Sequence, residues 1–192
     1  MPKQVDATAL RKDIREAARR VFARQGVQGT GLSHVAREAG MGRSSLYHYY
    51  PDKDALLGDL LAETLRDEAE LFRVSLRGEG STEERLHRLT DACVALLDTW
   101  AAAFRMMQDF RLSDASRFAG YFREIRDEFS SCLRAGQQAG EVAGSLDPEP
   151  AAATLIGAID GLLLQHFLDP EALDPEALRG ELRRIVARVV AP

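Results

Sequence analysis

The segment RSSLYHYYPDKDALL, residues 43–57, gathers side chains that suit recognition of a polar partner better than covalent catalysis. The guanidinium of Arg43 suits hydrogen bonding to guanine, and the two serines that follow it can each donate or accept at a base edge. The phenol hydroxyls of Tyr47 and Tyr49 can donate to phosphate oxygens while their rings lie along a sugar. These residue types predict contact with a nucleic acid.

Four consecutive aromatic rings at 47–50 cannot all be buried on one side of a helix. Tyr50 is expected to pack towards the following long helix, which leaves Tyr47 and Tyr49 as the phosphate contacts. The alternative, that these tyrosines are half-buried packing residues, stays open. His34 and His48 are expected to be exposed near DNA. Because no Cys or carboxylate cluster stands at metal-ligand spacing from these histidines, no metal site is predicted.

Two short helices joined by a glycine-containing turn must position these side chains. The pattern LSHVAREA predicts a helix over 32–39 that Gly40 ends, and a second short helix begins at Arg43 and ends before Pro51. This order is a helix-turn-helix, in which the second helix enters the major groove. Lys53 follows near the start of the next helix, where free backbone N–H groups favour phosphate.

Every other long segment shows helical periodicity, and no segment shows the alternation typical of a strand. A helix over 8–25 precedes the short pair, and a long helix over 52–77 follows it. Further helices are predicted over 82–100, 100–112, 115–139, 149–168 and 175–190. The predicted fold is all-α with nine helices: an N-terminal helix-turn-helix domain, 1–51, and a C-terminal helical domain, 52–192.

Charge is distributed unevenly along the chain. The 192 residues carry a net charge of −5, yet residues 1–50 carry +5 and the remainder carries −10. A basic first quarter predicts an anionic partner at that end, although a solvated basic face explains the same count.

Cellular location is indicated by the cysteines and the N-terminus. Cys93 and Cys132 stand far apart, which predicts buried free thiols in a reducing cytoplasm and no disulfide framework. The first 13 residues contain no apolar run, so no signal peptide is expected. We therefore expect a cytoplasmic protein.

The segment 149–168 is about as long as a membrane span, but Asp160, Gln165 and His166 interrupt it, which indicates a buried helix of a soluble protein. A helix that is apolar on all faces must be covered on all faces. Since only the last helix follows it, a second copy of the chain is expected to complete the cover as a homodimer. The predicted interface residues are Ala153, Ile156, Gly157, Leu164, Leu182, Ile185, Val186 and Val189.

A ligand pocket is predicted between the long helix and the middle helices of the C-terminal domain. Apolar and aromatic walls with few charges favour a small hydrophobic or aromatic ligand. The alternative that these side chains form ordinary core stays open. The predicted lining residues are Leu61, Leu65, Trp100, Phe104, Met107, Phe110, Tyr121, Phe122 and Ile159.

Motifs typical of enzymes are absent from the sequence: it contains no nucleophile elbow, phosphate-binding loop or dinucleotide fingerprint. No catalytic residue and no cofactor is therefore predicted. Two other classes stay open. One is an enzyme that uses the C-terminal pocket, for which Asp160 is the only buried acid available. The other is a helical adaptor that binds protein through residues 43–57.

The chain from about residue 10 to residue 57 resembles the TetR family of bacterial one-component transcriptional regulators. The family's closing pattern of a tyrosine, an aromatic pair, a lysine and a leucine is matched by Tyr47, Tyr49-Tyr50, Lys53 and Leu56. The earlier matches are Ile14, Ala17, Phe22, Gly26, Thr30, Val35-Ala36 and Ala39-Gly40. The chain departs from the family at Gly42, where a capping serine is frequent, at Gly31, where Ser or Thr is usual, and at Tyr50, where phenylalanine is common.

The resemblance implies a homodimer that binds a palindromic operator in double-stranded DNA, usually as a repressor. It also implies that a small molecule in the C-terminal domain moves the helix 52–77 and changes the separation of the two recognition helices. The residues expected to contact DNA are Thr30, Ser33, Arg43, Ser44, Ser45, Tyr47, His48, Tyr49 and Lys53.

Overall fold

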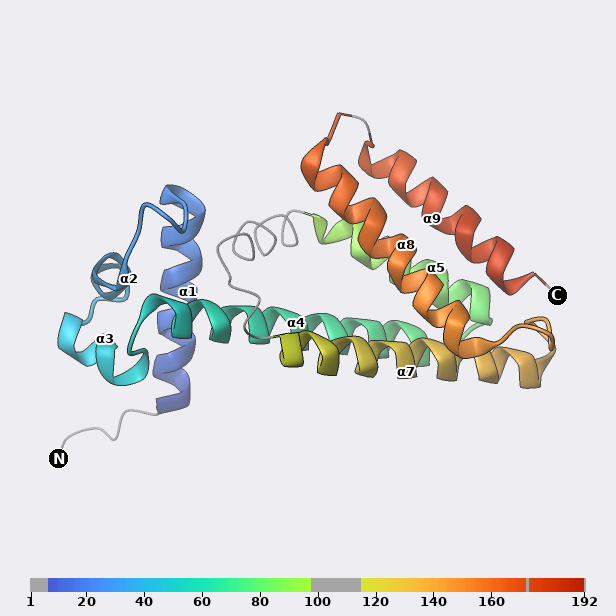
Figure 1. Cartoon of the computed structure of the whole chain (residues 1–192), viewed down its shortest axis with the longest axis horizontal. Helices are drawn as coiled ribbons and strands as arrows, with labels where there is room; N and C mark the ends of the chain where they lie inside the picture. Colours follow the sequence, from blue (N-terminus) through green and yellow to red (C-terminus); the bar gives the residue numbers. More distant parts are fainter. Residues whose placement is uncertain (1–6, 98–114, 172, 192) are drawn as a thin grey trace. The chain divides into compact units, whose positions relative to one another are not determined.

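The computed structural model describes residues 7–97, 115–171 and 173–191. Within these ranges it contains eight helices and no strand, so the predicted all-α fold class is confirmed (Figure 1). The ninth helix, predicted over 100–112, lies outside the described residues. The helices are α1 (Ala7–Gln25), α2 (Leu32–Glu38), α3 (Arg43–Tyr49), α4 (Lys53–Arg77), α5 (Thr82–Ala95), α7 (Ala115–Ala139), α8 (Pro148–Leu168) and α9 (Pro175–Val190).

The chain forms two compact units that divide within α4, between Thr64 and Leu65. The first unit contains α1 to α3 and the first three turns of α4, and the second contains the rest of α4 with α5 and α7 to α9. The first unit extends beyond the boundary expected after residue 51. The reason is that Leu56 and Leu60 of α4 are buried in the same core as α1 to α3.

The first unit is held together by apolar side chains at helical spacing on α1. Its buried stripe consists of Ile14, Ala17, Ala18, Val21 and Phe22. The partners of this stripe are Val35 and Ala36 of α2 and Leu46 of α3, each at most 3% exposed. Because α2 and α3 are short, they have few inward-facing side chains, and almost all of these pack in the core with α1.

The turn between α2 and α3 depends on Gly40, whose φ of +66° lies in the left-handed region that glycine tolerates best. The Met41 N–H donates to the Ala36 carbonyl at 2.9 Å, and the Gly40 N–H donates to the Arg37 carbonyl at 3.2 Å. This pair of bonds is a Schellman motif, which satisfies the last carbonyls of α2 and reverses the chain. The turn therefore delivers α3 next to α2, as a helix-turn-helix requires.

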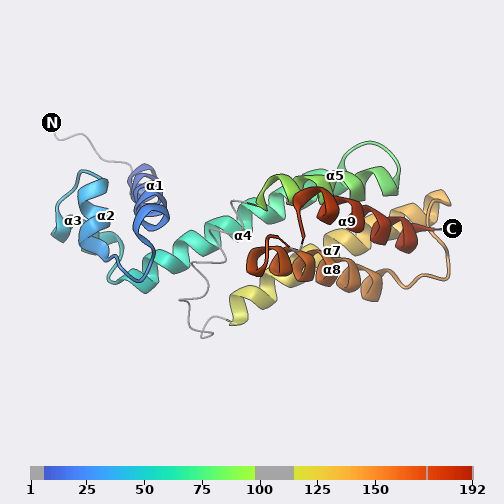
Figure 2. The same cartoon turned by 90° about the horizontal axis from the view of Figure 1, so that it is seen from above.

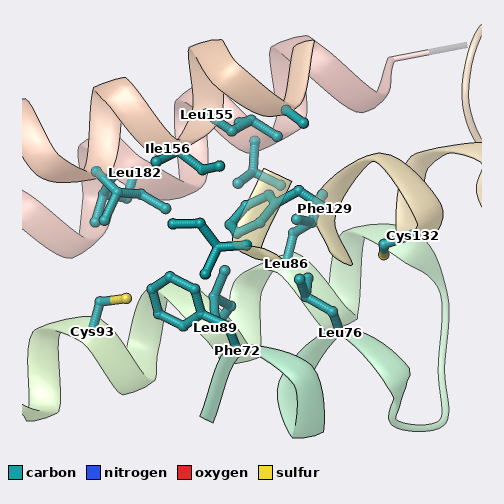
Figure 3. Packing of buried hydrophobic residues seen from close by; sticks show 14 of the residues in the cluster. Phe72, Leu76, Leu86, Leu89, Cys93, Phe129, Cys132, Leu155, Ile156 and Leu182 are labelled. Carbon is teal, nitrogen blue, oxygen red and sulfur yellow. The ribbon is translucent and has the colours of Figure 1, made fainter. Parts of the chain in front are cut away.

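The second unit is a helical bundle in which α8 packs against α7 and α9, and α5 packs against the same two helices (Figures 1 and 2). Figure 3 shows its core, in which Phe129 of α7 lies between side chains of the other helices. Phe129 is 0% exposed, and its ring contacts Phe72 of α4 edge to face with centroids 6.0 Å apart. Aromatic pairs in this geometry contribute to stability beyond the area they bury.

Helix α8 is covered by its own chain on more sides than the sequence predicted, because α7 packs against it as well as α9. Ile156 of α8 and Leu182 and Val186 of α9 are buried in the core of the single chain, so they offer no side chain to a partner. Among the described helices, α8 also has the length and composition of a membrane span, a property that core helices of soluble proteins share.

Replacing Phe129 with alanine is expected to lower the free energy of unfolding by about 3–5 kcal/mol, since a buried aromatic ring is lost and a cavity remains. Val74→Ala is the matched control, because Val74 is 61% exposed and its truncation should cost less than about 0.5 kcal/mol. Urea titration followed by circular dichroism measures both. A loss below about 1 kcal/mol for Phe129→Ala would contradict this description of the core.

Candidate nucleic-acid interface

The first turn of α3 points its polar side chains outward. Arg43, Ser44 and Ser45 are exposed, whereas Leu46 is fully buried and Tyr50, one turn later, is 2% exposed. Leu46 and Tyr50 are four residues apart and so share one side of the helix, which leaves the opposite side to solvent. The expected packing of Tyr50 is therefore confirmed.

Arg43 and Tyr47 form a pair on the exposed side of α3. The Arg43 Nη2 donates to the Tyr47 hydroxyl at 3.4 Å, and the Arg43 guanidinium carbon lies 5.6 Å from the Tyr47 ring centroid. Tyr47 is 41% exposed, which is high for a large aromatic residue. The pair presents a forked donor beside a phenol, a combination suited to a base edge and an adjacent phosphate.

The remaining residues of the predicted interface divide into exposed and internal groups. Ser33 and His48 are exposed, and Tyr49 is half-buried with its ring centroid 5.9 Å from the guanidinium carbon of Arg11. Thr30 is buried, and its hydroxyl lies 2.8 Å from the Gly26 carbonyl that it donates to. The Thr30 hydroxyl thus holds the loop before α2.

Two further side chains near this loop also form hydrogen bonds with backbone groups. The Lys53 ammonium donates to the Val27 carbonyl at 3.1 Å, which ties the start of α4 to the loop. His34 is half-buried, and its Nδ1 accepts a hydrogen bond from the Gly31 N–H at 3.1 Å. His34, at the third position of α2, therefore satisfies the backbone N–H of the N-cap residue Gly31, as the third residue of a capping box does.

Most arginines of the first unit are already paired with acids. On α1, Arg20 and Arg24 bind Glu38, while Arg15 and Arg19 bind acids of α4. Hydrogen bonds from Arg24 and Arg20 hold the pKa of Glu38 below its ordinary value. Of the arginines before residue 51, only Arg37 and Arg43 form no ion pair with another described residue.

The residues predicted to line a ligand pocket belong to different parts of the chain: the first unit, the second unit, and the segment outside the described residues. Tyr121 and Phe122 of α7 are half-buried with their rings 5.3 Å apart, and Leu65 of α4 is half-buried. Ile159 of α8 is buried in the core of the second unit, whereas Leu61 belongs to the first unit. The other four predicted lining residues, Trp100, Phe104, Met107 and Phe110, lie outside the described residues.

Two sequence patterns identify the family. Residues 14–60 match "Bacterial regulatory proteins, tetR family", and residues 83–191 match "BetI-type transcriptional repressor, C-terminal". The chain belongs to the TetR family of bacterial transcriptional regulators. It is a DNA-binding transcriptional regulator with an N-terminal helix-turn-helix domain, and members of this family are not enzymes.

Characterised relatives share modest identity with this TetR-family regulator over nearly its whole length. The regulator PksA of Bacillus subtilis is 25% identical, with 93% of this chain and 89% of PksA covered. TtgR of Pseudomonas putida is 26% identical, with 88% and 85% covered. BetI of Escherichia coli is 27% identical, with 98% and 97% covered.

Solved structures show the same fold. Reduced NemR of E. coli superposes with a TM-score of 0.77 at 18% identity, over 95% of this chain and 97% of NemR. A complex of SmeT with triclosan superposes with a TM-score of 0.73 at 19% identity, over 94% and 90% of the two chains.

The C-terminal domain of this TetR-family regulator contains a buried acid that the sequence did not reveal. Glu68 of α4 is 7% exposed, whereas Asp160, which was expected to be the only buried acid, is exposed. Burial raises the pKa of Glu68 to about 8, against a hydrogen bond from the Tyr121 hydroxyl and with the charge of Asp160 nearby. Although part of Asp160 reaches solvent, desolvation raises the pKa of its carboxyl to about 6.

One signal in the sequence marks Glu68. It follows Thr64 and precedes Phe72 at intervals of four, on the side of α4 that is buried. An acid in the apolar stripe of a helix is a candidate for burial.

Both cysteines of this TetR-family regulator are buried free thiols, as predicted. Burial raises the pKa of Cys93, with a further contribution from the charge of Glu68, and burial also raises the pKa of Cys132. Both groups are therefore protonated at neutral pH, and a thiol in that state is a poor nucleophile.

Glu68→Gln is expected to stabilise the protein at pH 8 more than at pH 5. The unfolded chain releases this proton near the ordinary pKa of 4.5, whereas the folded chain keeps it until about pH 8. The contribution of Glu68 to folding stability is therefore greatest below pH 4.5 and falls as the pH rises to 8, by up to about 3 kcal/mol at pH 7.

Thermal unfolding of the Glu68→Gln variant and of the unchanged protein, measured between pH 5 and pH 8, tests this effect. The control is Glu124→Gln, which alters an exposed acid of α7. A stability difference between Glu68→Gln and the unchanged protein that does not vary with pH would contradict the burial of a protonated Glu68.

Proposed function

We propose that this regulator is a cytoplasmic repressor that binds a palindromic operator as a homodimer and is released by a small hydrophobic effector. The observation that carries the proposal is the exposed first turn of α3, where Arg43, Ser44 and Ser45 stand beside the Tyr47 phenol. In a helix-turn-helix, these positions meet base edges in the major groove.

The contacts with DNA are of two kinds: some side chains read base edges, and others bind the sugar–phosphate backbone and position the protein on it. Arg43 donates to guanine, and the adjacent serines adapt to either a donor or an acceptor. Tyr47, His48 and the half-buried Tyr49 contact the sugar–phosphate backbone, as does Ser33 at the start of α2. These backbone contacts fix the register of α3 in the groove.

The homodimer forms through α8 and α9. The side chains of Ala153, Leu164 and Leu168 are exposed on α8 together with Gly157, and Leu164 and Leu168 are 40% and 66% exposed. Half-buried Ile185 and Val189 of α9 extend this surface. Small residues in the middle of the stripe allow two helices to approach closely, while leucines at its end provide apolar area.

The effector binds in the C-terminal domain near Leu65, Tyr121 and Phe122, where apolar and aromatic side chains remain half-buried. Among the described residues, the gap beside Phe129 and Ile159 has a volume of about 10 Å³, room for about one water, so this gap is too small to hold the effector. The same fold is known with bound small molecules, triclosan in SmeT and stearoyl-CoA in FadR of Bacillus subtilis.

Release from DNA follows from geometry. Two recognition helices must lie about 34–36 Å apart, one turn of DNA, or a multiple of that distance, to read two half-sites together. An effector that favours a different position of α4 shifts the dimer towards a spacing that does not fit the operator.

The proposal is tested by selecting genomic DNA fragments with the purified protein at near-physiological salt and sequencing what is retained. An enriched palindrome with two equal half-sites is expected. Absence of enrichment even at low salt, together with no steep loss of DNA affinity as salt rises, would contradict DNA reading and favour a protein adaptor.

Arg43→Ala is expected to relax base preference at one position of each half-site, at a cost of about 1–3 kcal/mol on the preferred sequence. Tyr47→Phe should weaken binding to all sequences by a similar factor, because it removes a phosphate contact. Arg126→Ala, which removes an exposed arginine of α7, is the charge-matched control. Unchanged binding preferences and affinities in both α3 variants would contradict the interface.

Leu164→Arg is expected to make the protein monomeric at micromolar concentration, because it replaces an exposed leucine of the proposed interface with a longer, charged side chain. Val74→Arg is the matched control, since Val74 is an exposed apolar residue on α4. Light scattering measures the mass of both variants. A monomeric unchanged protein, or a dimeric Leu164→Arg variant, would contradict the proposed interface.

A further inference from the structure

Asp59 of α4 connects three elements of the DNA-binding unit. Its Oδ2 accepts a hydrogen bond from the hydroxyl of Tyr50, the residue that ends the recognition helix α3. The same oxygen accepts from the Arg15 Nη1 of α1 at 3.1 Å. One carboxylate oxygen therefore joins the end of α3 to both α1 and α4.

Glu63, one turn later on α4, extends the network along α1. Its Oε1 lies 2.9 Å from the Arg15 Nη2, and its Oε2 lies 3.0 Å from the Arg19 Nη1. Arg15 thus binds acids on two successive turns of α4 through its forked guanidinium. These ion pairs fix α4 on α1, and of the two acids Asp59 is the one that also accepts a hydrogen bond from Tyr50 at the end of α3.

The surroundings of Asp59 keep it charged and its hydrogen bonds directional. Burial alone would raise the pKa of Asp59, but the hydrogen bonds from Tyr50 and Arg15 lower it below its ordinary value. Arg11 adds a second cation: its guanidinium carbon lies 5.1 Å from the Tyr50 ring centroid, and its Nη1 lies 4.0 Å from the Asp59 Oδ2. A partly buried, ionised acceptor forms stronger hydrogen bonds than a neutral one.

We propose that Asp59 is a positioning residue that sets the orientation of the recognition helix on α4 through the Tyr50 hydroxyl. Tyr50 occupies a position where the TetR family commonly has phenylalanine, which has no hydroxyl to donate. Since α4 is one continuous helix from Lys53 to Arg77, a displacement of its first turns is transmitted to α3 through Asp59. This inference rests on the proposed function, because the orientation of α3 matters only when α3 reads DNA.

A network that only stabilised the fold would act differently on DNA binding. Loss of folding stability leaves the ratio of specific to non-specific affinity unchanged in the molecules that remain folded. Loss of orientation lowers affinity for the operator, which needs base contacts, and spares binding to unrelated DNA, which needs only charge. The ratio of the two affinities therefore separates positioning from stability.

Glu38 provides a matched control in the same unit. Like Asp59, it is a carboxylate that binds two arginines of α1, Arg20 and Arg24. It joins α2 to α1 and has no contact with the end of α3 among the described residues. Glu38→Gln therefore makes the same chemical change as Asp59→Asn without touching the connection to Tyr50.

The experiment compares Asp59→Asn, Tyr50→Phe and Glu38→Gln by fluorescence anisotropy on the selected operator and on a scrambled duplex. All titrations are made at a temperature at which circular dichroism shows the variants folded. Asp59→Asn is expected to weaken operator binding by about tenfold and Tyr50→Phe by about fivefold, with scrambled DNA changed less than about twofold. Glu38→Gln should change both affinities by less than about twofold.

A double variant gives a second readout. Because Tyr50 and Asp59 act through one hydrogen bond, Asp59→Asn combined with Tyr50→Phe is expected to bind the operator no more weakly than Asp59→Asn alone. Additive losses would overturn the proposal, as would equal losses on operator and scrambled DNA. If Asp59→Asn does not fold, Tyr50→Phe decides alone, since it removes a single oxygen.

Failure of the inference differs from failure of the proposed function. If the unchanged protein does not prefer the operator to scrambled DNA, the proposed function is wrong and the role of Asp59 is overturned with it. If the unchanged protein shows that preference and both Tyr50→Phe and Asp59→Asn retain it in full, only the role of Asp59 is overturned.

Discussion

A helix of seven residues, the length of α3, is not stable in water by itself. Its conformation and direction depend on the burial of Leu46 and Tyr50 against the rest of the DNA-binding unit. The inner side of α3 thereby determines what its outer side can present, because a rotation about the helix axis would expose Leu46 and turn Arg43 away from the groove. The Schellman turn at Gly40 before α3 and the Asp59 contact after it constrain the two ends of this short element.

Ion pairs within the DNA-binding unit bear on how a protein of net charge −5 can bind DNA. Most α1 arginines neutralise acids of α2 and α4, so their charge holds the unit together and contributes little to the field at the groove. The charge count over residues 1–50 overstated the free positive charge, because two neutralising acids, Asp59 and Glu63, lie later in the sequence. Under the proposed function, affinity for DNA then depends on a few exposed donors such as Arg43 and on the joining of two copies of the chain.

Helix boundaries were predictable from the sequence because strong local signals mark them. Gly40 and Pro51 bracket the recognition helix, and the helix predicted from residue 82 begins at a capping box in which Ser81 and Glu84 exchange hydrogen bonds. Contacts between distant residues were not predictable. Nothing local indicates that the Tyr50 hydroxyl binds Asp59 or that Lys53 binds the Val27 carbonyl, since each depends on how helices pack. Glu68 was missed because an acid on a helix is usually solvated, although its place in the apolar stripe of α4 was a signal; contact with Tyr121 of α7 appears only in the structure.

Two affinities test the central claim most directly. One is the affinity of the protein for a duplex that contains the full selected operator, and the other is its affinity for a duplex that contains one half-site. A dimer that presents two copies of α3 should bind the full site at least about 100-fold more tightly, with two chains on each duplex. Equal affinity for the two duplexes, with one chain on each, would contradict DNA binding by a symmetric dimer.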